Sequence, residues 1–250
     1  MNTPIIGQQI IQLSEIDSTN NYVALALAAK QIESGSIVIA DVQTGGRGQR
    51  GNSWQSTSGQ NLLFSFPLDL TIFSTFHLSS LNHFVALGIH DFLSSYLDEV
   101  HIKWPNDIVV RNEKIAGVLI ETQLEKNRFK TAIIGIGLNI NQTDFQEKGI
   151  TSLGIETNQK YDLKHVLNEL VFYLNQRIEA LFSISYQPLK VHFENKLWLR
   201  GVKSTFEKRK DKTVFAGEII GTSDDGSLLM LVDDEVKRIQ NGEILFLERT

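Results

Sequence analysis

Two kinds of hydrophobic periodicity follow one another along the chain. Short apolar runs bounded by turn residues are typical of strands, and apolar residues that recur every three or four positions are typical of amphipathic helices. Strands are predicted over 10–16, 36–42, 61–68, 101–104, 107–110, 114–124 and 129–140. Helices are predicted over 17–35, 77–99, 162–183 and 187–199. Asp17 or Ser18 is the expected cap of the first helix, and Gly35 marks its expected end.

After Gly201 only short alternating runs remain. They cover 204–210, 213–220, 227–232 and 236–240, and the turns "KDK", "DDG" and "DDE" separate them. Many short strands with evenly spaced turns indicate a small β-barrel. We therefore predict an α+β protein. Its larger domain, residues 1–199, would hold a mixed sheet with flanking helices, and the barrel would occupy 200–250.

Composition excludes several kinds of chemistry. The 250 residues include no cysteine, which rules out disulfides, thiolate metal sites and a cysteine nucleophile, and the six histidines lack metal-binding spacing. A formal charge of -5 argues against a dedicated nucleic-acid binder. The apolar runs are too short to cross a membrane, and no signal peptide opens the chain, so we expect a cytoplasmic protein.

The segment "QTGGRGQRGNSW", residues 43–54, fits two phosphate-binding patterns. A dinucleotide fingerprint needs a helix directly after its glycines, but a loop and a strand are predicted there. A P-loop needs a lysine where this chain has Asn52, and a kinase glycine loop needs H-R-D and D-F-G segments that are missing. The glycine amides with Arg47 and Arg50 nevertheless suit a phosphate. The alternative is a mobile basic surface loop.

Two further segments carry candidate chemistry. In "KWPNDIVVRNEKIAG", residues 103–117, a tight hairpin would bring Asp107 opposite Lys114, although a solvated surface hairpin is the alternative. In "IIGIGLNIN", residues 133–141, strand alternation places Gly135 and Gly137 on one face with the following asparagines. Paired glycines in a strand favour a flat ligand on the sheet, or else a closely packed helix.

Together these segments resemble the biotin protein ligase family. The family's G-R-G-R-x-G-x-x-W loop matches Gly46 to Trp54, its K-W-P-N-D and K-x-A-G segments match 103–107 and 114–117, and its G-x-G-x-N strand matches 135–139. The early "DSTN", residues 17–20, also fits. The resemblance implies the biotin/lipoate ligase fold, which is similar to class II aminoacyl-tRNA synthetases, followed by an SH3-like domain. It implies that biotin and ATP form biotinyl-5'-adenylate, and that biotin then passes to a lysine of a biotin carboxyl carrier domain.

The resemblance also implies the site. Biotin would contact Ser18, Thr19, Asn20, Gln43, Gly46, Arg47, Trp54, Lys114, Gly117, Gly135 and Gly137. The nucleotide would contact Arg47, Gly48, Gln49, Arg50, Trp54, Asn106 and Asn139. The implied catalytic residues are Lys114, Arg47 and Asp107: Lys114 would hold the carboxylate against the α-phosphate, and Asp107 would hold Mg²⁺ or orient Lys114. Trp54 would close over the ligand and exclude water.

Some points depart from the family or stay open. Gln49 stands where the family usually has a second arginine, so we expect the adenylate to be held less tightly. Because the first motif begins at Asp17, no room is left for the DNA-binding domain of some family members, and we expect no DNA binding. A lipoate or octanoate ligase and a non-catalytic biotin or nucleotide sensor are the alternatives. The resemblance leaves monomer and homodimer both open.

Overall fold

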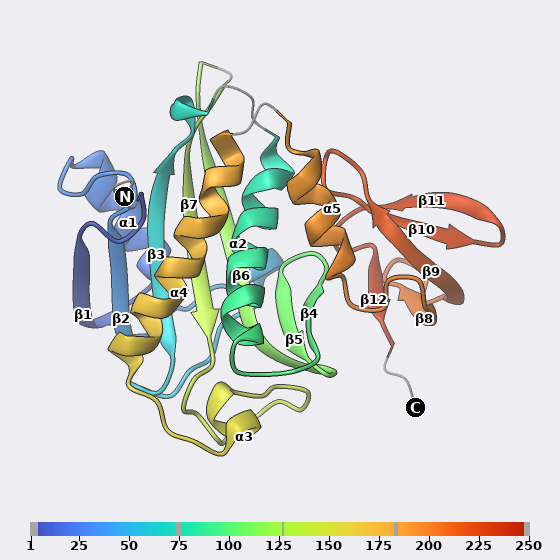
Figure 1. Cartoon of the computed structure of the whole chain (residues 1–250), viewed down its shortest axis with the longest axis horizontal. Coiled ribbons are helices and arrows are strands. Elements are labelled where there is room, and N and C mark those ends of the chain that lie inside the picture. The colour runs from blue at the N-terminus through green and yellow to red at the C-terminus, as the bar shows by residue number, and fades with distance from the viewer. Residues whose placement is uncertain (1–4, 74–76, 127, 183–184, 248–250) are drawn as a thin grey trace.

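A computed structural model describes residues 5–73, 77–126, 128–182 and 185–247, and it contains two sheets (Figure 1). The larger part holds β1 Ile10–Ile16, α1 Thr19–Ala28, β2 Ile37–Gln43, β3 Leu62–Asp69, α2 Leu78–Ser94, β4 Val100–Lys103, β5 Asp107–Val110, β6 Glu113–Glu125, β7 Arg128–Leu138, α3 Leu153–Thr157, α4 Leu163–Ile178 and α5 Gln187–Asn195. Single 3-10 turns lie at Gln49–Gly51, Leu70–Ile72 and Glu179–Phe182. The smaller part holds β8 Lys203–Lys208, β9 Val214–Thr222, β10 Leu228–Val232, β11 Glu235–Ile239 and β12 Ile244–Phe246.

The larger sheet is mixed, with strand order β1-β2-β3-β7-β6-β5-β4. Only β1 and β2 pair in parallel, because α1 carries the chain between them as a crossover. The strands from β4 to β7, which were predicted individually from the sequence, form an antiparallel meander. Long β7 pairs with both β3 and β6, which places the "IIGIGL" segment in the middle of the sheet.

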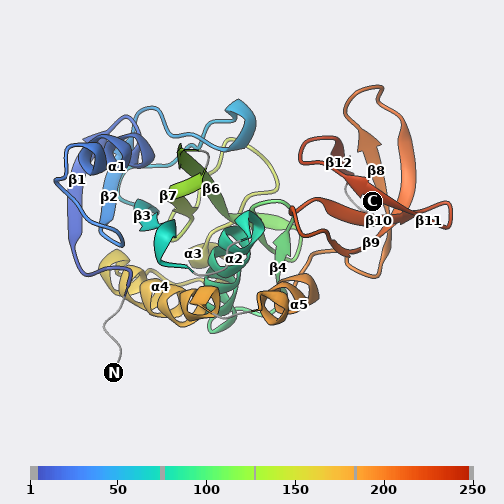
Figure 2. The same ribbon diagram turned by 90° about the horizontal axis from the view of Figure 1, so that it is seen from above.

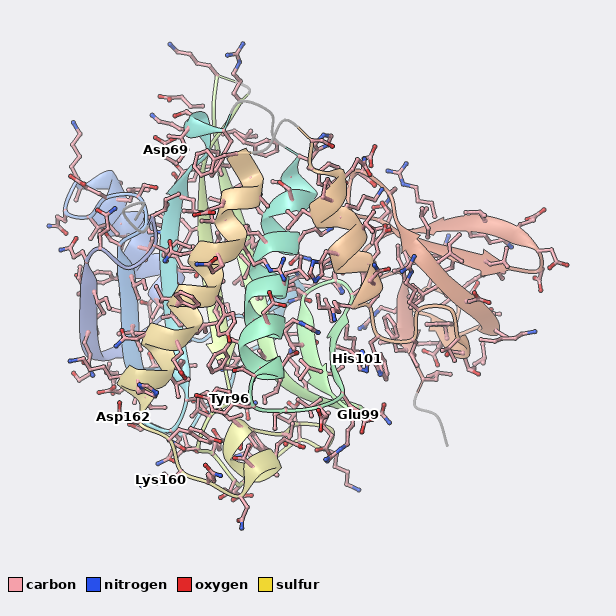
Figure 3. The ribbon with its side chains drawn as sticks, in the orientation of Figure 1. Asp69, Tyr96, Glu99, His101, Lys160 and Asp162 are labelled. Atoms are coloured by element: carbon pink, nitrogen blue, oxygen red, sulfur yellow. The ribbon has the colours of Figure 1, made fainter. Side chains whose placement is uncertain are left out.

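Helices cover both faces of this sheet. Figure 2 shows α2, α4 and α5 on one face and α1 on the other. Strand β3 is therefore buried on both sides: Phe64 and Phe66 pack in the main core under the helices, while Ser65 points toward α1. On α4 an apolar stripe packs in or against that core; it consists of Leu163, Val166, Leu167, Leu170, Leu174 and Ile178. Asp162 caps the helix that carries the stripe by accepting a 2.8 Å hydrogen bond from the His165 amide (Figure 3).

The C-terminal sheet is antiparallel, with order β11-β10-β9-β8-β12. Within the described residues β11 and β12 are its edges and do not pair with each other, so the predicted barrel is an open five-stranded sheet in its strand pairing. The sheet is fixed to the larger part by hydrogen bonds. Trp104 Nε1 donates to the Gly226 carbonyl at 2.9 Å, and the Thr222 amide and hydroxyl donate to Glu194 at 2.7 and 2.8 Å.

Several predicted boundaries were wrong. Helix α1 stops at Ala28, not at residue 35, because the chain turns into the left-handed region at Lys30 (φ 56°). Helix α2 ends at Ser94, not 99, and α5 ends at Asn195, not 199. Helix α4 gives way to a 3-10 turn after Ile178, and residue 183 of the predicted helix lies outside the described residues. Residue 127, in the segment between the strands predicted over 114–124 and 129–140, also lies outside them.

Two short elements were not predicted. Helix α3 has five residues and β12 has three, and both are too short to establish a hydrophobic period. Among the described residues, no helix combines the length and the apolarity that a membrane crossing requires.

Candidate active site

Most of the predicted site residues line two adjoining cavities on the face of the sheet that carries α1. The first cavity is lined by Ser18, Thr19, Asn20, Gln43, Arg47, Gly48, Gln49, Trp54, Asn106, Asp107, Lys114, Gly117, Gly135 and Gly137, with five other residues. The second is lined by Asn139, by the chain from 142 to 150 except residue 143, and by residues 53–57 with Lys103, Asp107, Val109, Asn112 and Lys114. Trp54, Asp107 and Lys114 line both cavities. Gly46 and Arg50 line neither.

A buried polar cluster forms the end of the first cavity. The Gln43 side-chain oxygen accepts from the Thr19 amide at 2.8 Å and from the Thr19 hydroxyl at 3.1 Å. Ser65 continues the chain of contacts, 2.6 Å from the Thr19 hydroxyl and donating at 2.6 Å to Asn20 Oδ1. These buried groups are held in fixed positions by one another, as a polar recognition pocket requires. Ser65 was missed because an isolated serine in an apolar strand carries no sequence signal.

Arg47 of the glycine loop reaches across the cavity to Glu121 on β6. Its Nη2 atom lies 3.0 Å from Glu121 Oε2 and donates at 2.8 Å to Asn21 Oδ1. The same Glu121 oxygen accepts from Asn20 Nδ2 at 2.7 Å. Asn21 also donates to Asp17, which holds the pKa of Asp17 below its usual value. Sequence reasoning missed Glu121, which faces the loop only because β6 pairs beside β7.

Trp54 lies directly on the glycine face of β6 and β7. A β-carbon on Gly117 would come within 2.9 Å of Trp54 Cζ3, and one on Gly137 would overlap the indole ring. A β-carbon on Gly135 would overlap the Asn20 amide in the same way. The flat ligand expected over the strand glycines stays a prediction: in this structure the Trp54 indole takes the space beside Gly117 and Gly137, and Asn20 of α1 takes the space beside Gly135.

The side chains of Lys114 and Asp107 form an ion pair, although the ladder pairs Asp107 with Gly117 and not, as predicted, with Lys114. Lys114 Nζ lies 2.7 Å from Asp107 Oδ1 and 5.3 Å from the centre of the Trp54 ring, close enough for a cation–π contact. A bulge between β5 and β6 follows Ile108, and it sets Lys114 against Val109 in the ladder. The main chain of Lys114 is also fixed, because its amide donates to the Gly149 carbonyl at 2.8 Å and its carbonyl accepts from the Thr151 amide at 2.9 Å.

Each of the two asparagines predicted to contact the nucleotide already donates a hydrogen bond to the main chain. Asn106 Nδ2 donates to the Val118 carbonyl at 2.8 Å, and Asn139 Nδ2 donates to the Thr151 carbonyl at 3.0 Å. Asn139 Oδ1 remains buried without a hydrogen-bond partner. The segment 142–150 that completes the second cavity was not predicted, since nothing in its composition marks it as part of a site.

Gln49 and Arg50 both contact the C-terminal sheet. Gln49 Oε1 accepts from Asn241 Nδ2 at 2.8 Å, and Arg50 Nη2 donates to the Asn241 carbonyl. The structure thus brings Arg47, Asp107 and Lys114 to the cavities but does not bring Arg50 to them.

Unpaired polar atoms are concentrated in this site. Across the described residues, four buried side-chain polar atoms lack a hydrogen-bond partner of good geometry: Trp54 Nε1, His83 Nδ1, Asp107 Oδ1 and Asn139 Oδ1. Three of them line the two cavities, where Asp107 Oδ1 has Lys114 close by without a well-directed hydrogen bond. Unsatisfied buried groups are costly, so their clustering indicates a site prepared for a polar ligand.

The geometry defines an enzyme core that holds a cation between two ligand cavities, and comparison with known proteins identifies its family. The model of the biotin/lipoate A/B protein ligase family matches residues 13–139, half of the chain. The chain belongs to this family.

Individual relatives match this chain over a longer span than the family model does. The bifunctional ligase/repressor BirA of Bacillus subtilis is 31% identical over 252 residues, which cover 98% of this chain and 76% of the relative. The biotin–[acetyl-CoA-carboxylase] ligase of Mycobacterium tuberculosis is 28% identical over 140 residues, covering 54% of this chain and 50% of the relative. The structure of the biotin protein ligase from Aquifex aeolicus in complex with biotin and ATP superposes with a TM-score of 0.79 at 28% identity, over 97% of this chain and 100% of that chain.

Proposed function

We propose that this protein is a biotin protein ligase. It joins biotin to ATP as biotinyl-5'-AMP with release of pyrophosphate, and it then transfers the biotinyl group to a lysine of an acceptor protein. The observation that carries the proposal is the position of Lys114, whose side chain borders both cavities beside Asp107 and Trp54. The family and the Aquifex aeolicus complex with biotin and ATP support the same assignment.

In the first step, a biotin carboxylate oxygen forms a bond to the α-phosphorus of ATP, and the bond from that phosphorus to the bridging oxygen of pyrophosphate breaks. No protein nucleophile takes part, so the rate comes from positioning and from neutralising charge. Lys114 Nζ is the cation that would lie between the carboxylate in the first cavity and the α-phosphate in the second. Arg47 would leave Glu121 or share its guanidinium with the ligand's anionic groups.

The first cavity suits biotin and the second suits the nucleotide. The fixed oxygens and N–H groups of Thr19, Asn20 and Gln43 can bond a ureido ring, and Ser18 lies at the start of the same helix without a side-chain capping bond. The flat bicycle would lie over Gly117, Gly135 and Gly137 in place of, or beside, the Trp54 indole. Asn139 Oδ1 would accept from the nucleotide.

Magnesium fits the residues present only as a metal carried by the nucleotide. Among the described residues no group of three histidine, aspartate or glutamate side chains could hold a metal ion. Asp107 Oδ1 is a buried carboxylate oxygen without a well-directed hydrogen bond, and Mg²⁺ is often bound by one carboxylate together with substrate phosphates. Asp107 would therefore hold Mg²⁺ on ATP, where the metal neutralises phosphate charge, and Asp107 orients Lys114 in its absence.

In the second step, the uncharged ε-amine of an acceptor lysine attacks the acyl carbon of the adenylate, an amide bond forms, and AMP leaves with the bonding electrons. We infer that the acceptor is the biotin carboxyl carrier domain of a biotin-dependent carboxylase. The Mycobacterium tuberculosis relative, a biotin–[acetyl-CoA-carboxylase] ligase, supports this acceptor class. A cytoplasmic location agrees with the need for ATP.

Exchange of labelled pyrophosphate into ATP tests the proposal. The assay is run with biotin, lipoate, octanoate or no acid. Exchange that requires biotin supports it. Exchange with lipoate or octanoate but not with biotin would mean a ligase for another acid. If the protein binds biotin but catalyses no exchange with any of the acids, the alternative of a non-catalytic biotin or nucleotide sensor is favoured.

A further inference from the structure

The turn between β11 and β12 contacts the glycine loop, although about 190 residues separate them. Asn241 Nδ2 donates to Gln49 Oε1 at 2.8 Å, and the Asn241 carbonyl accepts from Arg50 Nη2. The Arg50 guanidinium also lies where a β-carbon on Gly242 would be. Both loop residues therefore rest on one turn of the C-terminal sheet.

This turn, residues 240–243, is itself well ordered by hydrogen bonds. The Glu243 amide donates to the Gln240 carbonyl at 3.1 Å, and the Glu243 carboxylate accepts from the Gln240 amide at 2.8 Å. Gly242 has φ 77° at the third position, as a type II turn requires, and a side chain there would be both strained and in the place of Arg50. The turn thus presents Asn241 in a fixed orientation.

A continuous set of contacts ties the turn back to the larger domain. Gln240 Nε2 donates to Ser227 Oγ at 2.9 Å, one residue beyond Gly226. Gly226 accepts from Trp104 Nε1 at 2.9 Å, and Trp104 lies between Lys103 and Pro105, three residues before Asp107. The C-terminal sheet therefore bridges the segment that carries Asp107 and the glycine loop that carries Arg47.

We propose that Asn241 is a positioning residue for the glycine loop, acting through Gln49 and Arg50. It holds the loop over the first cavity and so slows release of the bound adenylate, a role that rests on the proposed function. Gln49 makes this dependence specific to the present sequence, because its side chain bonds the turn. The loop itself, including Arg47, is closed by bonds between Gly48 and Asn52 and between Gly46 and Trp54, so the turn acts on it as one unit.

The contact can be tested without any ligand. Trypsin cleaves after arginine, so the rate of cutting after Arg47 and Arg50, followed by mass spectrometry under native conditions, reports how often the loop opens. We expect Asn241→Ala to raise this rate about fivefold, the factor that one neutral hydrogen bond contributes. Asn241→Asp should restore slow cleavage, because Gln49 can turn its amide and donate to the carboxylate. Lys237→Ala, on exposed β11, is the matched control.

A second measurement connects the loop to the reaction. The rate at which labelled biotinyl-5'-AMP leaves the protein should rise in Asn241→Ala and return toward the wild-type rate in Asn241→Asp. Cleavage of Asn241→Ala at the wild-type rate overturns the proposal, and so does faster cleavage with unchanged adenylate release. If the wild-type protein forms no adenylate with any acid, the proposed function fails, while the cleavage rates still decide whether Asn241 holds the loop.

Discussion

Lys114 and Asp107 face each other across neighbouring strands, with 2.7 Å between Nζ and Oδ1. The lysine is half-buried against Trp54, and the carboxylate oxygen has no well-directed hydrogen bond of its own. An ion pair that is close in distance but incomplete in hydrogen bonding can open at modest cost when two anions and a metal arrive. The pair is therefore suited to separate and bind the charged groups of the substrates, and it adds little to the stability of the fold.

Replacing Lys114 should separate binding from chemistry. In Lys114→Ala the cation between the two anions is lost, so we expect adenylate formation to fall on the order of 100-fold or more, with biotin binding largely retained. Pyrophosphate exchange and calorimetric titration of biotin measure the two effects. Lys130→Ala, which removes an exposed lysine paired with Glu125 far along β7, is the control. Unchanged turnover in Lys114→Ala would remove this residue from its assigned role.

Adding a methyl group at Gly137 should disturb the first cavity through Trp54. The new β-carbon would overlap the indole, so Trp54 must move or the strand must shift. We expect Gly137→Ala to weaken biotin binding by roughly tenfold and to change the tryptophan emission of the unliganded protein, because about 1–3 kcal/mol is typical of overpacking. Wild-type affinity together with unchanged emission would contradict this packing.

Restoring the family's arginine at position 49 should tighten the hold on the adenylate. Gln49→Arg adds a positive charge beside the anion site, and Asn241 can turn its amide oxygen toward the new side chain, so the contact with the turn is kept. We expect the adenylate to dissociate several-fold more slowly, as measured by chasing bound label with unlabelled ligand. An unchanged dissociation rate would refute the idea that Gln49 weakens retention.

His83 should make the fold sensitive to acid. His83 is buried on α2, and the centre of its ring lies 4.1 Å from that of Phe193 and 5.9 Å from that of Tyr186. Burial lowers the pKa of His83 from 6.5 to about 3. Because the unfolded chain binds this proton below pH 6.5 and the folded chain does not until about pH 3, the free energy of unfolding falls as the pH drops through that window.

Urea unfolding at several pH values between 7.5 and 5 measures the effect. His83 alone contributes a slope of up to about 1.4 kcal/mol per pH unit. His83→Phe keeps an aromatic ring in the stack and removes the titrating group, so its free energy of unfolding should depend less steeply on pH. Equal slopes for the two proteins would show that His83 is not the acid-sensitive group.

Much of the site could be predicted because its motifs are local. The turn that brings the Asp107 and Lys114 side chains within reach of each other and the alternation that aligns Gly135 with Gly137 follow from short stretches of sequence. Contacts made between distant segments could not be predicted in this way. Ser65 and Glu121 join the site only through the order of strands in the sheet, and Arg50 meets Asn241 only because the C-terminal sheet packs beside the glycine loop.

The ends of helices are also difficult to predict from short stretches of sequence. The apolar patterns before Gly35 and from Leu78 onward indicate where helices lie, but Lys30 in the left-handed region ends α1 several residues before the expected glycine. Local backbone geometry of this kind is decided by packing of the following segment, in which Ile32 joins a small cluster under α1.

The position of Trp54 also bears on how inhibitors should be sought. With the indole lying on Gly117 and Gly137, the first cavity measures about 110 Å³, whereas pockets for drug-sized molecules usually measure roughly 300 Å³ or more. A compound must therefore displace the half-buried Trp54 ring before it can bind, and its measured affinity is reduced by the rarity of the open form. Screening against a Trp54→Ala or otherwise opened site would reveal compounds that a rigid search of the closed cavity rejects.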